Sequence, residues 1–291
     1  MDYVGRIFRP PSEAHSLLLQ ISVGCSHNGC TYCDMYTEKS FSVKSREVVE
    51  RDLEEARAMG PRFTRLFLCD GDALILSTRR LLEILEAIRT KLPWVSRVSC
   101  YGDTRSVLKK SVAELKALRE AGLEMVYHGV ESGSDAVLER IVKGGTREEV
   151  IQTAQRLREA GMKHSVILLL GIGGTDLSEE HARETASLLT AIDPPFVGVL
   201  TTTVIPGTPL DQAQSRGEFS LPGKFEMLRE LKTLVEGSAL TDCRFSSNHA
   251  SNYLPLRSTL PGDKDAIVEA LDHVLAAQDE GLLKPEFLRG L

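Results

Sequence analysis

The stretch 17-LLLQISVGCSHNGCTYCDMY-36 joins a short apolar run to three closely spaced cysteines. The run 17-LLLQISV-23 is rich in Leu, Ile and Val and is followed by a glycine, as is typical of buried parallel strands. Cys25, Cys30 and Cys33 come directly after it, within nine residues. The pattern therefore predicts a buried strand that leads into a loop carrying three thiols.

Further apolar runs repeat the first half of this pattern along the chain. They are 64-TRLFLC-69, 95-VSRVSC-100, 125-MVYHGV-130, 166-VILLL-170 and 196-FVGVLTTT-203. Helical patterns lie between them, some with start signals: Ser45 before 46–59, Ser111 with Glu114 in capping-box spacing before 112–121, and Ser178 before 179–192. Later helices are expected at 222–236 and 263–280, with one more strand within 242–249. Such alternation predicts an α/β fold with a parallel sheet.

Polar or glycine-rich segments follow the predicted strands. After the cysteine loop they are 70-DGDAL-74, 101-YGD-103, 131-ESGSD-135, 171-GIGGTD-176, 204-VIPGTPL-210 and 248-NHASN-252. In α/β barrels the loops at the carboxyl ends of the strands build the active site. We therefore expect these segments to point into one mouth.

Composition narrows the class of protein. The chain has 291 residues, of which 42% are hydrophobic and 26% charged, values ordinary for a globular protein. No apolar run approaches the length of a membrane span, and residues 1–20 lack a signal-peptide pattern, so we expect a cytoplasmic location. Thiols stay reduced there, which favours metal binding or catalysis over disulfides. The net charge of -6, with scattered Lys and Arg, argues against a nucleic-acid partner.

The number of clustered cysteines is itself informative. Thiolates bind zinc or iron–sulfur clusters, and a structural zinc site normally closes with four ligands. A [4Fe–4S] cluster held by three cysteines would leave one iron free to bind a substrate or cofactor. The alternatives are a zinc site completed by His27 or His249, and a disulfide pair.

With these cysteines the sequence resembles the radical SAM enzymes, whose hallmark is a three-cysteine loop after the first strand of a partial (β/α)6 barrel. Their usual spacing is CxxxCxxC, whereas Cys25, Cys30 and Cys33 have one more residue in the first gap. The resemblance covers roughly residues 15–210, and 127-YHGVESGSDAVLERIVKGGT-146 is similar to the subgroup of coproporphyrinogen dehydrogenases and Elp3-like enzymes. It implies a partial (β/α)6 TIM-type barrel over 17–210, after an N-terminal extension at 1–16. A C-terminal helical extension, 211–291, would cover the mouth.

The resemblance also implies roles for individual residues. Cys25, Cys30 and Cys33 would ligate the [4Fe–4S] cluster, and Tyr32 would pack near the adenine of S-adenosylmethionine. The remaining residues that would bind this cofactor are Asp70, Gly71 and Asp72, Glu131 and Ser132, and Gly171, Ile172 and Gly173. Each has a plainer interpretation: a turn for 70–72 and 171–173, a helix cap for Glu131, and core packing for Tyr32.

The implied activity is reductive cleavage of S-adenosylmethionine to a 5′-deoxyadenosyl radical, which abstracts hydrogen from a small-molecule substrate. An electron donor such as flavodoxin or ferredoxin would supply the electron. Candidates for catalytic side chains are Tyr101, His128 and His249. Two other functions remain open: a heme- or porphyrin-binding chaperone on the same scaffold, and a zinc-stabilised barrel with hydrolytic activity.

Overall fold

The computed structural model describes residues 1–290, which divide into two compact units. The first contains Met1–Asn28, Cys33–His128 and Gln152–His164, and the second contains Gly29–Tyr32, Gly129–Ile151 and the described chain from Ser165 onward. Strands β6 (Leu123–Glu131) and β7 (Lys163–Leu170) each begin in the first unit and end in the second. Across residues 1–290, every helix is too short or too polar to cross a lipid bilayer.

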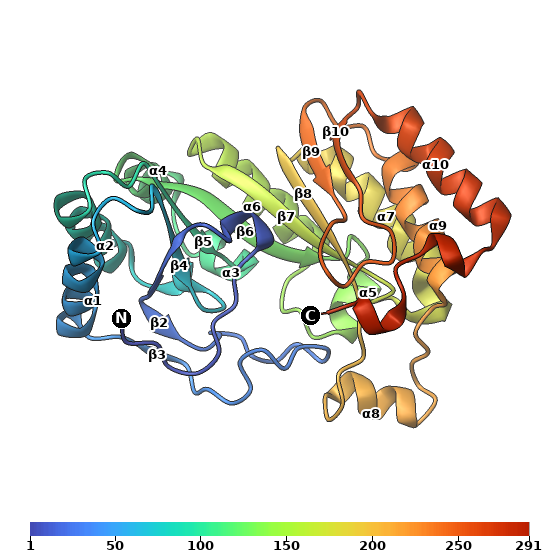
Figure 1. Cartoon of the computed structure of the whole chain (residues 1–291), viewed down its shortest axis with the longest axis horizontal. Helices are drawn as coiled ribbons and strands as arrows, with labels where there is room; N and C mark the ends of the chain where they lie inside the picture. Colours follow the sequence, from blue (N-terminus) through green and yellow to red (C-terminus); the bar gives the residue numbers. More distant parts are fainter. Residues whose placement is uncertain (291) are drawn as a thin grey trace. The chain divides into compact units, whose positions relative to one another are not determined.

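Parallel strands form the centre of the first unit. Strand β1 (Leu17–Gln20) pairs with β4 (Arg65–Cys69), β4 with β5 (Arg97–Tyr101), and β5 with the first part of β6. The helices are α1 (Arg46–Ala58), α2 (Thr78–Lys91), α3 (Thr104–Leu108), α4 (Val112–Glu120) and most of α6 (Arg147–Glu159), with short 3-10 turns at Pro11–Glu13 and Ala73–Ile75. Helix α2 packs between α1 and α4, as Figure 1 shows.

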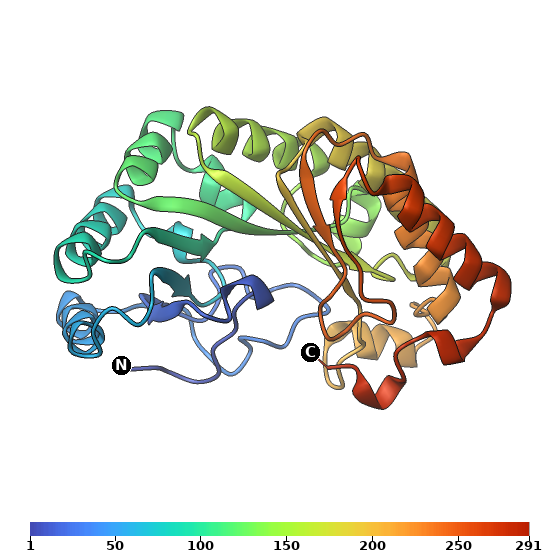
Figure 2. The same ribbon diagram turned by 45° about the horizontal axis from the view of Figure 1, so that its top comes forward.

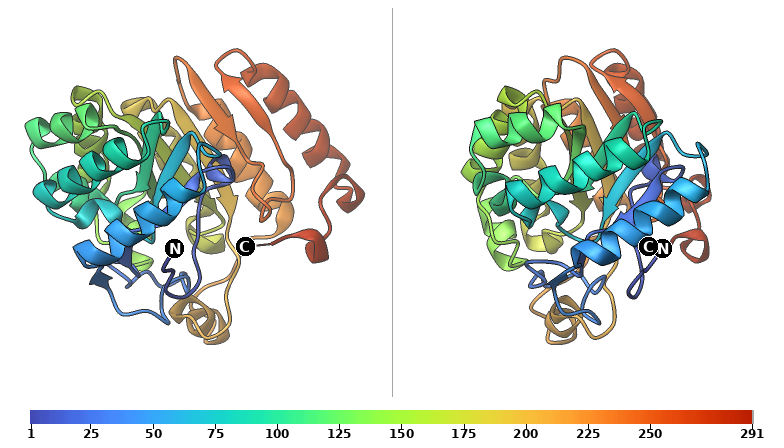
Figure 3. Two further views of the ribbon diagram at one scale, coloured as in Figure 1. Left: turned by 60° about the vertical axis from the view of Figure 1, so that its left-hand side comes forward. Right: turned by 90° about the vertical axis from the view of Figure 1, so that its left-hand side faces the viewer.

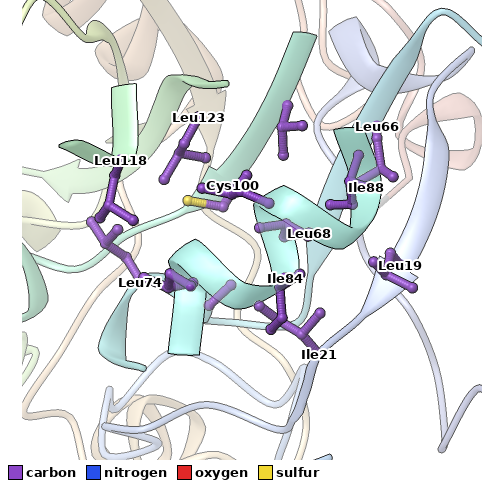
Figure 4. Packing of buried hydrophobic residues seen from close by; sticks show 14 of the residues in the cluster. Leu19, Ile21, Leu66, Leu68, Leu74, Ile84, Ile88, Cys100, Leu118 and Leu123 are labelled. Atoms are coloured by element: carbon purple, nitrogen blue, oxygen red, sulfur yellow. The ribbon is translucent and has the colours of Figure 1, made fainter. Parts of the chain in front are cut away.

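The core of the first unit lies between these helices and the sheet. Leu66 and Leu68 of β4 are fully buried, and Ile84 and Ile88 of α2 are nearly so. Figure 4 shows the thiol of Cys100 among leucines from β4, α4 and β6. Alternation of strand and amphipathic helix therefore produces the βαβ packing expected from the sequence.

The second unit continues the pattern with β7, β8 (Phe196–Thr201) and β9 (Cys243–Ser246), which are parallel, and β10 (Arg257–Leu260), which runs antiparallel beside β9 (Figure 3). Its helices are α5 (Asp135–Arg140), α7 (Gly174–Ile192), α8 (Pro209–Ser215), α9 (Lys224–Gly237) and α10 (Lys264–Ala277), with 3-10 turns at Glu280–Leu282 and Glu286–Leu288. Helix α9 packs on both α7 and α10 (Figure 2).

The fold class expected from the sequence is confirmed, because eight of the described strands belong to one mostly parallel sheet. Two local expectations were wrong. The first strand ends at Gln20, and Ser22–Val23 form a separate strand, β2, paired antiparallel with β3 (Ser42–Val43). Helix α7 begins at Gly174 rather than after Ser178, because the turn 171–173 leads directly into it and frees the Ser178 hydroxyl for another bond.

The predicted caps at Ser45 and Ser111 are present. The Ser45 hydroxyl accepts a hydrogen bond from the Val48 N–H. Ser111 and Glu114 form the full reciprocal capping box at the start of α4. These local signals place the helix starts, and the helices in turn support the strand ends that carry the candidate site.

Candidate cofactor site

The three cysteines lie on the loop between β2 and β3. All three side chains are half-buried, and Cys25 and Cys33 belong to the first unit, whereas Cys30 belongs to the second. Gly24, just before Cys25, has φ +79°, a conformation that favours glycine, and so turns the chain out of β2. Among residues 1–290, no three His, Cys, Asp or Glu side chains form a ready metal site, so the ligand set stays a prediction from the cysteine pattern.

Asp70, at the end of β4, holds the start of the cysteine loop. Its side chain is fully buried, and its Oδ2 accepts hydrogen bonds from the Gly24 N–H at 2.7 Å and the Gln20 side-chain amide at 2.9 Å. The Lys39 ammonium lies 3.3 Å from the same oxygen. This carboxylate is therefore committed to the loop backbone and to a buried cation.

Gly71 lies directly against Cys25. A Cβ added at Gly71 would come 2.8 Å from the Cys25 Cβ, 3.1 Å from its Sγ and 3.0 Å from Cε2 of Tyr36. Real Cβ atoms essentially never make contacts as short as the first of these. The Gly71 N–H also donates to the Gly24 carbonyl at 3.1 Å. Only glycine lets the backbone after β4 approach this thiol so closely.

Asp72 connects the cysteine loop to the start of α3. Its Oδ2 accepts hydrogen bonds from the hydroxyls of Ser26, at 2.6 Å, and Ser106, at 2.5 Å. Its Oδ1 accepts from the Asp103 N–H at 3.2 Å. Burial raises the pKa of the Asp72 carboxyl, and the serine hydrogen bonds oppose that rise.

The ring of Tyr36 lies beside Gly71, and its hydroxyl has no partner among the described residues. The side chain is 4% exposed, its ring meets Phe8 edge-on, and its oxygen has no hydrogen-bond partner in the part of the chain that the structure describes. Burial raises the pKa of Tyr36 far above its ordinary value, so the hydroxyl stays a neutral donor. An orphaned donor next to Gly71 and Cys25 fits a bound group with acceptor atoms, as an iron–sulfur cluster and an amino-acid carboxylate have.

In the second unit, the segment around Cys30 is held by backbone bonds. The Thr31 N–H donates to the Ile141 carbonyl at 3.0 Å, and the Thr31 carbonyl accepts from the Leu210 N–H at 2.9 Å. Tyr32 packs against a small apolar cluster that also contains Ile172. Two residues expected to bind S-adenosylmethionine therefore lie in one apolar group.

Glu131 and Ser132, at the end of β6, have different surroundings. Glu131 has φ +67°, and its Oε1 pairs with the Lys143 ammonium at 3.1 Å. A Cβ added at Gly129 would come 2.3 Å from the same oxygen. Ser132 is fully buried, and its hydroxyl bonds Nδ1 of His181 at 2.8 Å. Glu131 is thus paired with a cation, and Ser132 with a buried histidine.

The turn at residues 171–173 is tight and is held by hydrogen bonds to side chains from other elements. Gly171 has φ +80°, Ile172 is fully buried, and the Gly173 carbonyl accepts from Arg140 at 2.9 Å. The Gly171 N–H donates to Oε2 of Glu230 on α9 at 2.6 Å. Sequence reasoning missed Glu230; the available signal was a charged residue within the apolar stripe of an amphipathic helix.

The candidate catalytic side chains differ in accessibility. His128 is fully buried, with Nε2 bonded to the Thr104 hydroxyl at 2.8 Å and Nδ1 to Nε2 of His164 at 3.1 Å. Tyr101 is half-buried and meets Phe67 edge-on. His249 is half-buried, and its Nδ1 accepts from the Ser251 N–H at 3.2 Å. Burial and the nearby Lys284 lower its pKa, which favours neutral imidazole.

Comparison with known proteins identifies the family. The sequence pattern of the Radical SAM superfamily matches residues 19–189, more than half of the chain. The chain belongs to the radical SAM superfamily. Members of this superfamily bind a [4Fe–4S] cluster and S-adenosylmethionine. The resemblance seen in the cysteine loop is confirmed, and with it the partial (β/α)6 TIM-type barrel as the fold class.

Individual radical SAM relatives are distant and longer. A biotin synthase of Alkalilimnicola ehrlichii is 26% identical over 226 residues, covering 77% of this chain and 64% of that protein. The heme chaperone HemW of Bacillus subtilis is 27% identical over 208 residues, covering 68% and 53%. The structure of coproporphyrinogen III oxidase (HemN) from Escherichia coli matches with a TM-score of 0.54 at 17% identity, covering 76% and 52%. The chain thus spans about half to two thirds of these relatives, and the last comparison shows a shared fold.

Proposed function

We propose that this chain is a radical SAM enzyme that binds a [4Fe–4S] cluster through Cys25, Cys30 and Cys33 and cleaves S-adenosylmethionine to act on a small-molecule substrate. The observation that carries the proposal is the contact of Gly71 with Cys25, which leaves no room for a side chain. That contact brings a strand-end backbone against a predicted ligand thiol, as a cofactor bound to the cluster would require.

When bound, the cluster and S-adenosylmethionine would supply one-electron cleavage of the sulfonium C–S bond, which would release methionine and a 5′-deoxyadenosyl radical able to abstract hydrogen from the substrate. The residues of this chain would bind these cofactors and orient them. Tyr36 offers its unpaired hydroxyl, and Tyr32 with Ile172 offers an apolar surface for adenine. Asp70 and Asp72 hold the cysteine loop through Gly24 and Ser26. An external donor of the flavodoxin or ferredoxin class would supply the electron.

The substrate-facing groups of this proposal lie at the end of β5 and after β9. Tyr101 and His249 are half-buried and are therefore the accessible members of the candidate catalytic set. His128 serves as a core residue, because both of its ring nitrogens have partners inside the protein. Residues 211–291 would cover the mouth of the barrel.

A heme-binding chaperone is the second candidate, favoured by the identity of 27% to HemW over 68% of this chain. Both functions share the scaffold and differ in their ligand. Tight stoichiometric heme binding without cleavage of S-adenosylmethionine would support the chaperone function and contradict the enzymatic one.

The test is anaerobic reconstitution with iron and sulfide, followed by dithionite and S-adenosylmethionine. We expect a brown protein that forms 5′-deoxyadenosine, whereas Cys30→Ala lacks both the visible absorption and the product but keeps the far-ultraviolet circular dichroism of a folded chain. Cys243→Ala is the matched control, because Cys243 is a buried thiol of β9. Colourless protein with bound zinc, or product from Cys30→Ala at the wild-type rate, would refute the proposal.

A further inference from the structure

A buried carboxyl group from helix α9 holds the turn at residues 171–173. Glu230 is 2% exposed, its Oε2 accepts the Gly171 N–H at 2.6 Å, and its Oε1 accepts the Ser178 hydroxyl at 2.6 Å. Gly171 directly follows β7, and Ser178 lies near the start of α7. Glu230 thus fixes this segment from an element outside residues 19–189, which match the superfamily.

The same carboxyl group faces a buried histidine. Nε2 of His181 lies 3.9 Å from Oε2 of Glu230, and both side chains are buried. On its other side, His181 bonds the Ser132 hydroxyl through Nδ1 at 2.8 Å, and that hydroxyl accepts the Ser134 N–H at 3.0 Å. A polar chain therefore connects Gly171, after β7, with Ser132, after β6.

Glu230, and not His181, changes protonation near neutral pH. Burial raises the pKa of Glu230 to about 7, opposed by the bonds from Ser178 and Gly171, and it lowers the pKa of His181 to about 4. The titratable groups facing Glu230 are His181 on α7 and Glu226 on its own helix, which raises its pKa further. Helix α10 also packs on α9, but its Asp272 pairs with Lys232.

The two protonation states hold the turn differently. An ionised carboxylate accepts the Gly171 N–H in a charge-assisted hydrogen bond, which is roughly twice as strong as a neutral one. A protonated carboxyl group is a weaker acceptor, because it carries no net charge. Deprotonation of Glu230 therefore tightens the turn.

We propose that Glu230 is a positioning residue that, when ionised, holds the turn at residues 171–173 in the conformation that receives the adenosyl part of S-adenosylmethionine. This rests on the proposed function. Cofactor binding then tightens as Glu230 loses its proton. By linkage, binding of the cofactor must lower the pKa of Glu230 by the corresponding amount.

The experiment measures binding without turnover. The oxidised, reconstituted protein is dialysed to equilibrium against labelled S-adenosylmethionine at pH 6 and pH 8, on either side of the Glu230 pKa of about 7. We expect wild-type affinity to be about fivefold higher at pH 8, the lower end of usual coupling between sites. Glu230→Gln should lose this dependence, while Glu236→Gln, exposed on the same helix, should keep it.

A second measurement needs no variant. The infrared absorption of protonated buried carboxyl groups in the wild-type protein is titrated with and without S-adenosylmethionine. We expect the midpoint near pH 7 to fall when the cofactor is bound. A midpoint that does not move, or a Glu230→Gln variant with the wild-type pH dependence, would overturn the inference. Failure of the wild-type protein to bind the cofactor at either pH would instead contradict the proposed function.

Discussion

The carboxylate of Asp70 accepts the backbone N–H of Gly24 at 2.7 Å, so the end of β4 holds the residue that precedes the first cysteine of the loop. The same oxygen receives the Gln20 amide, from the end of β1. Strands β1 and β4 are parallel neighbours, and this carboxylate joins their carboxyl ends. The position of Cys25 is therefore set by the sheet and not by the loop alone.

Replacing Asp70 should loosen that arrangement. In Asp70→Asn, an amide must accept from three donors with one neutral oxygen, and we expect about 2 kcal/mol of lost stability, as for a buried hydrogen bond to a charged group. Iron content after reconstitution should fall severalfold. Urea unfolding and iron analysis measure these effects, with Asp272→Asn, at an exposed position of α10, as the control. Full iron content in Asp70→Asn would show that the loop needs no such support.

Gly71→Ala tests the close approach to Cys25. The added methyl group would lie 2.8 Å from the Cys25 Cβ, so either the loop or the turn must move. We expect a folded protein that assembles the cluster poorly, measured by visible absorption and bound sulfide. At Gly198, a Cβ would meet nothing nearer than 3.9 Å, so Gly198→Ala should behave as wild type in the same assay.

Tyr36→Phe should have opposite effects on the empty and the loaded protein. Removing a buried hydroxyl that lacks a partner relieves an unpaired polar group, so the cluster-free protein should unfold at an equal or higher urea concentration. If the hydroxyl serves the cofactors, the loaded variant should bind S-adenosylmethionine at least several times more weakly. Equal cofactor affinity in Tyr36→Phe and wild type would remove Tyr36 from the site.

The pair of His128 and His164 predicts acid sensitivity. Burial, and then electrostatic interaction with His128 and Arg158, keep the pKa of His164 well below its ordinary value. The unfolded chain binds a proton below about pH 6.5 and the folded chain does not, so the free energy of unfolding decreases as pH falls through that value. His164→Gln should be less stable at pH 7.5 but lose less stability on acidification to pH 5.

The control for this comparison is His273→Gln, exposed on α10. It should keep the wild-type acid dependence in urea unfolding. Glu230, whose raised pKa of about 7 gives the opposite slope between pH 7 and 4.5, is present in all three proteins and cancels in the differences. An unchanged acid slope in His164→Gln would mean that His164 already binds a proton in the folded state.

The parts of the fold that the sequence predicts are those with local or periodic signals. Strands β4, β5 and β8 lie within a few residues of their expected positions. The capping box at Ser111 is where the sequence predicts it. Strands β3 and β10 carry no such signal, because β3 has two exposed residues and β10 is mostly open to solvent. Their pairing depends on tertiary contacts with β2 and β9.

The site residues also divide into those that have a local sequence signal and those that have none. The cysteines, Gly71 and the turn at 171–173 belong to short motifs and could be named in advance. The partners of the buried groups could not, because His128 meets His164 across 36 positions and Gly171 meets Glu230 across 59. Such pairs depend on strand register and helix rotation, which a single sequence does not specify.

The hydrogen bond between Glu230 and Gly171 also bears on what can be exchanged between relatives. The superfamily pattern over residues 19–189 includes the turn but not the helix that holds it. A hybrid that kept this segment and took its carboxyl-terminal part from another lineage would leave the Gly171 N–H without its buried acceptor, unless the new helix brought one. The segment that must be exchanged as one piece is therefore longer than residues 19–189, because it has to include α9 together with the turn that α9 holds.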